Sequence, residues 1–263
     1  MFFAYLRRGV KAGVVAGLVF GLLVALVANP LVAFADELAH GGDQAGEHGH
    51  EHAAETEGHA GGSHHDSAVS MAMTNTVSVV SGVLWGVLLG VVVFGVAYYF
   101  LEPLLPGTGA TKSVLLAAAG FLTVSGGPWL VLPPQPPGVE QSLPTDTRLL
   151  LYGGMMAATA LVSLTALVAY DRLRATRSRA RSVVVAVTPY SLLAVPVALV
   201  PTNGVANTVP AEVATGLTGL IVFGQALLWL TLAGTHAWLC GRSDDRPVGD
   251  VGTELPDGPP AAD

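Results

Sequence analysis

The sequence predicts an all-α integral membrane protein: a bundle of about six transmembrane helices with a His/acid-rich external loop and a disordered C-terminal tail. Its composition is 51% hydrophobic and only 12% charged, whereas soluble domains have roughly 25% charged residues. Six stretches without Asp, Glu, Lys or Arg are long enough to cross a hydrocarbon core, which takes about 20 helical residues. They cover residues 12–35, 77–101, 113–133, 149–170, 183–201 and 213–240. Because lipid offers the backbone no hydrogen-bond partner, each stretch is expected to be a helix of one membrane domain, residues 1–240.

The basic residues predict the orientation of the bundle, because Arg and Lys accumulate in the cytoplasmic loops of membrane proteins. Eleven of the twelve basic residues fall on one side of the six spans, and only Arg148 falls on the other. The eleven are Arg7, Arg8, Lys11, Lys112, Arg172, Arg174, Arg177, Arg179, Arg181, Arg242 and Arg246. We therefore predict a multi-pass protein of the cytoplasmic membrane, with both termini cytoplasmic and the loop 36–76 outside.

The two ends of the chain differ from the spans between them. Basic residues, an apolar run and Ala33-Phe34-Ala35 before Asp36 resemble a secretory signal peptide. The apolar run 12–35 is longer than the 7–15 residues of a signal-peptide core, which favours a retained first helix; cleavage would leave five helices and the same loop. Residues 241–263 are rich in Pro, Gly and Asp, and they are predicted to form a disordered acidic cytoplasmic tail.

The loop 36–76 contains seven of the eight histidines, and its segment 40–66 has no Lys or Arg. Neutral imidazole nitrogen is a good ligand for first-row divalent metals, and carboxylates add oxygen donors. Glycines in the segment allow the donors to wrap around an ion rather than hold it in a preformed cage. The predicted metal ligands are His40, His48, His50, His52, His59, His64, His65, Glu47, Glu51 and Asp66. The alternative is a solvated polar linker whose histidines have no role.

The spacing of these histidines does not select one metal. The segment has no HExxH motif and no fixed ligand set, and such a site should prefer Cu²⁺ or Ni²⁺ to Co²⁺. We therefore predict capture of ions rather than tight storage.

The sixth span contains the remaining histidine. Gln225, Trp229, Leu232 and His236 recur at i, i+4, i+7 and i+11 and therefore share one helix face. Polar groups inside a membrane are costly and often line pathways, so Gln225 and His236 are candidate residues of a transport path. The alternative is that His236 is a hydrogen-bonded packing residue near a helix end.

Small residues and prolines predict how the spans pack and where they bend. Small residues four apart let helix backbones approach closely in lipid; they are Gly9, Gly13, Gly17 and Gly21 in the first span and Ser78, Gly82, Gly86 and Gly90 in the second. Pro128 interrupts the third span, and Pro189, Pro196 and Pro201 interrupt the fifth. Each interior proline frees a carbonyl oxygen one turn earlier, which either contacts a cation or is satisfied by a neighbouring helix.

Several functional classes lack support. The few basic residues follow membrane topology and do not form a nucleic-acid-binding surface. Cys240 is the only cysteine, which excludes an internal disulfide and a CxxC motif. The segment 107–113, GTGATKS, lacks the preceding strand and the second glycine of a phosphate-binding loop. The spans lack a nucleophile with its base and acid, so the chain is predicted to be no enzyme and to hold no tightly bound cofactor.

Three further features occur in a characteristic order. A Gly-rich first helix ends in Asn29-Pro30-Leu31-Val32 and Asp36-Glu37, the His/acid loop follows, and Gly120-Phe121-Leu122 leads to Leu132-Pro133-Pro134-Gln135-Pro136-Pro137-Gly138. This order resembles the CbtA family of predicted cobalt transporter subunits, over most of the chain up to about residue 240. The resemblance implies cobalt uptake together with a small partner, CbtB, which has one membrane helix and its own histidines.

We therefore expect a subunit that moves a divalent metal ion inward after its capture by the external loop. The resemblance makes Co²⁺ the expected ion, with Ni²⁺ or Zn²⁺ as alternatives, and a CbtB-like subunit and membrane lipid the expected partners. The alternative function is a membrane-anchored metal sensor or assembly scaffold that does not itself transport. No predicted span contains a carboxylate, so coupling to protons through a buried Asp or Glu has no candidate residue.

Overall fold

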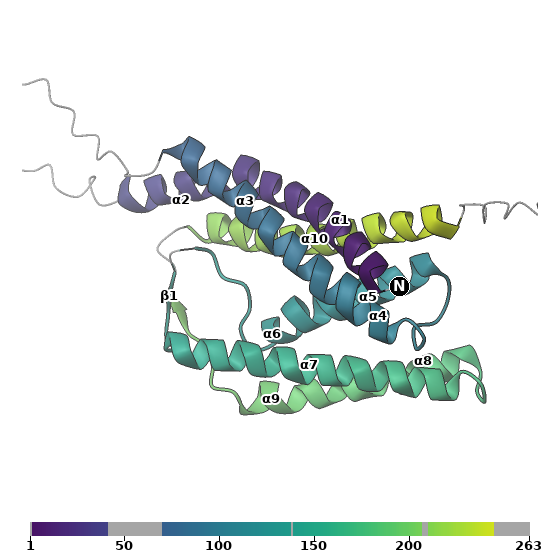
Figure 1. The fold of residues 1–263 in the computed structure, drawn as a ribbon. Coiled ribbons are helices and arrows are strands. Elements are labelled where there is room, and N and C mark those ends of the chain that lie inside the picture. Colours follow the sequence, from purple (N-terminus) through teal and green to yellow (C-terminus); the bar gives the residue numbers. More distant parts are fainter. Residues whose placement is uncertain (1, 42–69, 138, 207–209, 245–263) are drawn as a thin grey trace, which may run out of the picture.

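A computed structural model describes residues 2–41, 70–137, 139–206 and 210–244 of the chain. Within these residues, six helices are long and apolar enough to cross a membrane. They are Phe2–Leu38, Met71–Leu101, Gly109–Trp129, Thr145–Leu173, Arg179–Leu199 and Ala211–Arg242. The predicted all-α membrane fold with six spans is therefore confirmed (Figure 1).

Four of the six spans contain segments of different helix geometry. The first consists of α1 (Phe2–Leu23), the π-helical η1 (Val24–Ala28) and α2 (Asn29–Gly41); the second of α3 (Met71–Leu89), the π-helical η3 (Gly90–Ala97) and α4 (Tyr98–Leu101). The third consists of α5 (Gly109–Phe121), the π-helical η4 (Leu122–Gly126) and α6 (Gly127–Trp129); the fifth of α8 (Arg179–Val187), the 3₁₀-helical η5 (Thr188–Leu193) and α9 (Ala194–Leu199). The fourth and sixth are the continuous helices α7 (Thr145–Leu173) and α10 (Ala211–Asp244).

The helices and the apolar stretches do not have the same ends. The first helix begins at Phe2 rather than at residue 12 and therefore includes Arg7, Arg8 and Lys11. Polar residues outside the hydrocarbon can continue the backbone hydrogen bonds of a helix, so hydropathy marks only its apolar part. The third and fifth spans end at Trp129 and Leu199 rather than at residues 133 and 201. Segments with prolines follow both ends, and proline has no backbone N–H to continue a helix.

Pro128 shows how an interrupted span satisfies its backbone. This proline follows η4 and has no N–H to donate to the carbonyl oxygen of Val124, four residues earlier. The hydroxyl of Tyr152 in α7 donates a hydrogen bond to that oxygen. At this proline the freed carbonyl is therefore bonded to a neighbouring helix, which is the alternative to a cation contact.

The two ladders of small residues pack directly against each other. Gly9 meets Gly90, Gly13 meets Gly86 and Gly17 meets Gly82, while Gly21 lies against Ser78 and Val79. A Cβ added at any of these glycines would lie within about 3.2 Å of backbone atoms of the facing helix. The predicted role of both ladders in close helix packing is confirmed, and the structure shows that each ladder is the other's partner. We call this contact the glycine seam.

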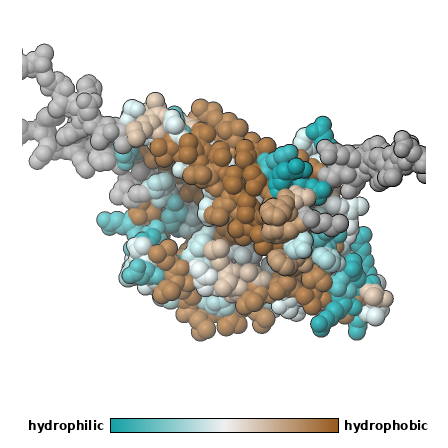
Figure 2. All heavy atoms as spheres, in the orientation of Figure 1, coloured by the Kyte–Doolittle hydropathy of each residue, from teal (hydrophilic) through white to brown (hydrophobic). Residues whose placement is uncertain are grey.

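The bundle has a central group of helices and a peripheral pair. The first three spans and α10 share a buried cluster that includes Ala12, Ala16, Phe94, Leu228 and Leu232. A smaller cluster joins α7 to η5 through Met155, Val162 and Leu193. Figure 1 shows α7 and α9 in a layer of their own. Apolar side chains cover the middle of the face drawn in Figure 2, and polar ones gather toward its two ends, as a membrane-spanning protein requires.

The two ends of the bundle differ in charge. The start of α1, the α4–α5 and α7–α8 connections and the end of α10 lie at one end (Figure 1). The described basic residues of the predicted cytoplasmic side belong to these segments, and Arg246 lies outside the described residues. At the other end β1 (Glu140–Gln141) pairs antiparallel with β2 (Val205–Ala206), with Glu140 opposite Ala206. Arg148, near the start of α7, belongs to this second end.

Gly86→Ala should destabilise the protein, whereas Gly154→Ala should not. A Cβ at Gly86 would lie against the backbone of Gly13 and Gly17, while a Cβ at Gly154 meets nothing within 4 Å. Overpacking costs about 1–3 kcal/mol, and Ala in place of Gly otherwise favours a helix by about 1 kcal/mol. Thermal unfolding of the detergent-solubilised variants measures both effects, and equal melting temperatures would contradict the glycine seam.

Candidate functional site

Most of the predicted metal ligands lie outside the described residues. The structure includes His40 in the last turn of α2, without describing its side chain, and resumes at Ser70. His48, His50, His52, His59, His64, His65, Glu47, Glu51 and Asp66 belong to the segment 42–69 that it does not describe. Among the residues that it does describe, no three His, Cys, Asp or Glu side chains gather at a metal-binding distance.

His236 of α10 is completely buried against the second and third spans. Its ring lies between those of Phe94 and Tyr98, with centroid distances of 4.8 Å to both. The ring nitrogen Nδ1 lies 2.8 Å from the hydroxyl oxygen of Ser113 in α5, which is itself completely buried. Nε2 is buried and has no hydrogen-bond partner among the described residues. His236 therefore has both a fixed position and unused hydrogen-bonding capacity.

Gln225 lies on the same side of α10 and contacts the same span as His236. The Ser125 hydroxyl of η4 donates to its side-chain oxygen at 3.3 Å. Between the two levels, Trp229 packs against Gly120 so closely that a Cβ there would overlap the indole ring. The helix face predicted from spacing thus packs against the third span. The contact between α10 and this span contains two polar pairs at different heights, Gln225 with Ser125 and His236 with Ser113.

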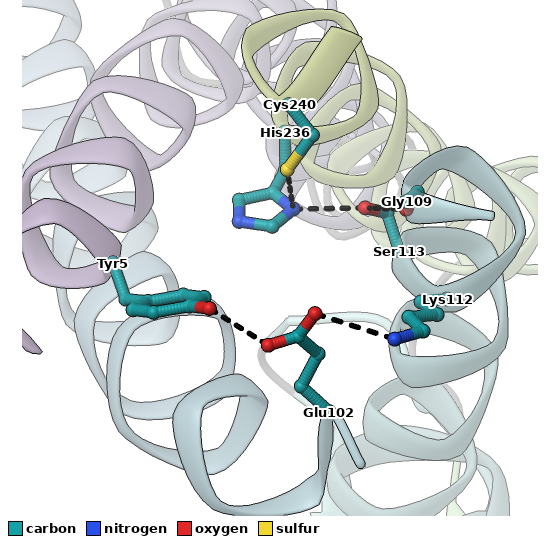
Figure 3. A network of polar contacts seen from close by, with 7 residues as sticks. All are labelled: Tyr5, Glu102, Gly109, Lys112, Ser113, His236 and Cys240. Carbon is teal, nitrogen blue, oxygen red and sulfur yellow. Dashed lines mark hydrogen bonds and ion pairs between the residues drawn. The ribbon is translucent and has the colours of Figure 1, made fainter. Parts of the chain in front are cut away.

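A second polar cluster lies at the end of the bundle that carries the basic residues. The Tyr5 hydroxyl donates to one oxygen of Glu102 at 2.7 Å, and Lys112 approaches the other oxygen at 3.2 Å. Figure 3 shows this cluster beside His236, Ser113 and Cys240. The hydrogen bond from Tyr5, together with the Lys112 ammonium, holds the pKa of the Glu102 carboxyl below its ordinary value, although partial burial opposes this shift. Glu102 is therefore ionised and neutralised by Lys112 at neutral pH.

Sequence reasoning missed these partners for identifiable reasons. Glu102 directly follows the second apolar stretch, and nothing local indicates that Tyr5 reaches it from the first helix. Ser113 lies 123 residues before His236 and was only a span boundary. Cys240 was considered only as a single cysteine that excludes a disulfide and a CxxC motif, although its spacing of four from His236 places both on one helix face.

The fold and these polar contacts, of which the His236–Ser113 pair is buried, define a polytopic membrane protein whose central helices hold ionisable groups near one end of the bundle. The chain belongs to the CbtA family, described as "Probable cobalt transporter subunit", because this family matches residues 2–241, nearly the whole chain. No curated protein and no solved structure matches the chain.

Tyr5→Phe should lower the thermal stability of the protein at neutral pH but not in acid. A carboxyl with a depressed pKa stabilises the folded state above its ordinary pKa of 4.5 and loses this contribution as the pH falls through the lowered value. Because Glu102 is partly exposed, we expect a decrease of only about 2 °C in melting temperature. Melting curves from about pH 7 to about pH 3 test this, with Tyr99→Phe as the control; a difference that persists in acid would contradict it.

Proposed function

We propose that this protein is the membrane-spanning subunit of a cobalt uptake system. The observation that carries the proposal is the match of the CbtA family to residues 2–241, in a chain with six candidate membrane spans. The description of the family supports a transporter subunit rather than an enzyme. Co²⁺ is the proposed cargo, and Ni²⁺ and Zn²⁺ have the same preference for nitrogen ligands.

The external loop captures the ion in this proposal. Its seven imidazoles and its carboxylates supply nitrogen and oxygen donors in excess of what one ion needs. Because the donors are redundant, no single histidine is essential, and the loop collects ions without selecting cobalt over copper or nickel. Selection then requires a second set of donors whose positions are fixed.

The proposed path follows the seam between α10 and the third span. Support comes from Gln225 and His236, which present an amide and an imidazole toward this span at two levels. Polar groups at such depth are costly in lipid, and a row of them on one helix face gives a dehydrated ion successive donors. His236 is the best-fixed of these donors because two aromatic rings and Ser113 surround it.

The orientation that we propose places both termini in the cytoplasm. The basic segments lie at the N-terminal end of the bundle, and cytoplasmic loops are the ones enriched in Arg and Lys. The loop 36–76 then faces the outside of the cytoplasmic membrane. We also propose that the first helix is retained, since it supplies half of the glycine seam. A small CbtB-like subunit with one membrane helix is the proposed partner, in keeping with the description of the family as a subunit.

Uptake of ⁵⁷Co²⁺ by proteoliposomes tests the function. Vesicles containing the purified protein with its partner should accumulate cobalt, and vesicles with either protein alone would show whether one subunit suffices. If the protein binds cobalt but no combination of subunits transports it, the alternative of a membrane-anchored sensor or assembly scaffold replaces the proposal.

Cysteine labelling tests the orientation. In a Cys240→Ser background, Ser63→Cys should react with a membrane-impermeant thiol reagent in intact cells, whereas Ser178→Cys should react only after the cells are opened. Ser178 is exposed between α7 and α8, so its protection would come from the membrane rather than from burial. The reverse labelling pattern would invert the proposed topology.

Replacing the loop histidines and replacing His236 should have different effects on uptake. Exchange of all seven loop histidines for Ser should weaken uptake chiefly at low external metal, and leave the ranking of cobalt, nickel and zinc intact. His236→Ala should lower maximal uptake or alter that ranking even at saturating metal. A loop variant with a changed ranking of the three metals, beside a His236→Ala variant with normal uptake, would overturn this division of roles.

Wild-type uptake at low metal should also fall below about pH 6, because imidazole with its ordinary pKa of about 6.5 must be neutral to bind.

A further inference from the structure

Three potential metal donors converge where the end of α10 meets the start of α5. His236 Nδ1 lies 2.8 Å from Ser113 Oγ and 3.8 Å from Cys240 Sγ. Ser113 Oγ also lies 2.8 Å from the carbonyl oxygen of Gly109. The side chains of His236 and Ser113 are completely buried, and that of Cys240 is 6% exposed. Figure 3 shows the imidazole, the thiol and the hydroxyl directed toward one another.

Helical spacing produces this convergence from two directions. His236 and Cys240 are four residues apart in α10, so their side chains lie one turn apart on the same face. Ser113 and Gly109 have the same spacing in α5, which brings the serine hydroxyl beside the glycine carbonyl. One helix therefore supplies nitrogen and sulfur, and the other supplies two oxygens.

The distance between nitrogen and sulfur fits one shared ion. In tetrahedral sites such as those of zinc, a metal lies about 2.1 Å from nitrogen and about 2.3 Å from thiolate sulfur, which puts these two donors roughly 3.6 Å apart. The observed separation is 3.8 Å. Ser113 Oγ lies 2.8 Å from Nδ1, closer than a second ligand of the same ion would be. Rotation about the Cα–Cβ bond of Ser113, which moves Oγ away from Nδ1, must therefore accompany binding.

The hydrogen bonds of Ser113 determine which ring nitrogen of His236 carries the proton. Ser113 Oγ donates its only proton to the carbonyl oxygen of Gly109, so Nδ1–H donates to Ser113 Oγ at the 2.8 Å contact. Binding of an ion at Nδ1 therefore requires the ring proton to move to Nε2, which is buried and has no hydrogen-bond partner among the described residues. The lone pair that this shift leaves on Nδ1 lies on the side of the thiol and the hydroxyl.

We infer that His236 Nδ1 and Cys240 Sγ bind the divalent ion inside the bundle, and that Ser113 positions the imidazole and adds an oxygen donor. The inference rests on the proposed transport function and identifies the fixed donors that this function requires. Binding displaces the thiol proton, which leaves to water at the basic end of the bundle. A thiolate and an imidazole favour cobalt, nickel and zinc over the hard cations Mg²⁺ and Ca²⁺.

Thiolate-to-cobalt charge-transfer absorption tests the site without relying on transport. Cys240 is the only cysteine of the chain, so only this residue can give the near-ultraviolet band when Co²⁺ is added to the purified full-length protein. The band should appear in the wild type and in the variant without the seven loop histidines, and be absent in Cys240→Ser. His236→Ala should weaken the cobalt affinity read from the band by more than about 10-fold, and Ser113→Ala by about 10-fold, as for residues that position a ligand.

Alkylation of Cys240 in the wild-type protein tests the same site without any substitution, so it does not depend on whether the variants fold. Zn²⁺ should slow the alkylation of Cys240 by a small thiol reagent in proportion to its occupancy, while Mg²⁺ should not. Absence of the band at saturating cobalt, an unchanged alkylation rate with Zn²⁺, or an unchanged affinity in a folded His236→Ala variant would each overturn the site. If the band appears but the protein does not take up cobalt, the metal site stands and the transport proposal is refuted. If the protein takes up cobalt but gives no band, the transport proposal stands and the metal site is refuted.

Discussion

The glycine seam is the contact on which the rest of the bundle depends. Its pairs allow the backbones of the first and second spans to approach as no larger residue would. This contact fixes the register of the two helices, and the functional groups follow from it. Tyr5, one turn before Gly9, reaches Glu102 beyond the end of α4. Phe94 and Tyr98, four and eight residues after Gly90, come to lie against His236.

Hydropathy and spacing are sufficient to predict the spans and the two ladders of small residues, because both depend on local pattern. A run of apolar residues must be helical in lipid, and glycines four apart form a groove whichever helix fills it. The helix ends were not predictable in the same way, since α1 includes Arg7, Arg8 and Lys11, which hydropathy does not assign to a span. The π-helical segments η1, η3 and η4 had no sequence signal that we recognised.

The partners of the buried polar groups depend on tertiary structure and were not predictable. Spacing placed Gln225 and His236 on one face of the sixth span, but could not tell that Ser125 and Ser113 of the third span face them. It also could not decide between the two roles of a proline-freed carbonyl, which the Tyr152 hydroxyl decides at Pro128. The relation between His236 and Cys240 was readable in principle, and its significance emerges only when Ser113 completes the group.

Uptake places opposite demands on the two ends of the proposed path, because an ion must bind well enough to enter and weakly enough to leave. The external loop has many imidazoles and carboxylates, which suits capture from dilute solution. The buried group has one imidazole, one thiol and a hydroxyl, and its smaller negative charge suits release. Glu102 lies near this group, but Lys112 already neutralises it. In the proposed path, this ion pair keeps a carboxylate from retaining the cation at the point where it has to leave the protein.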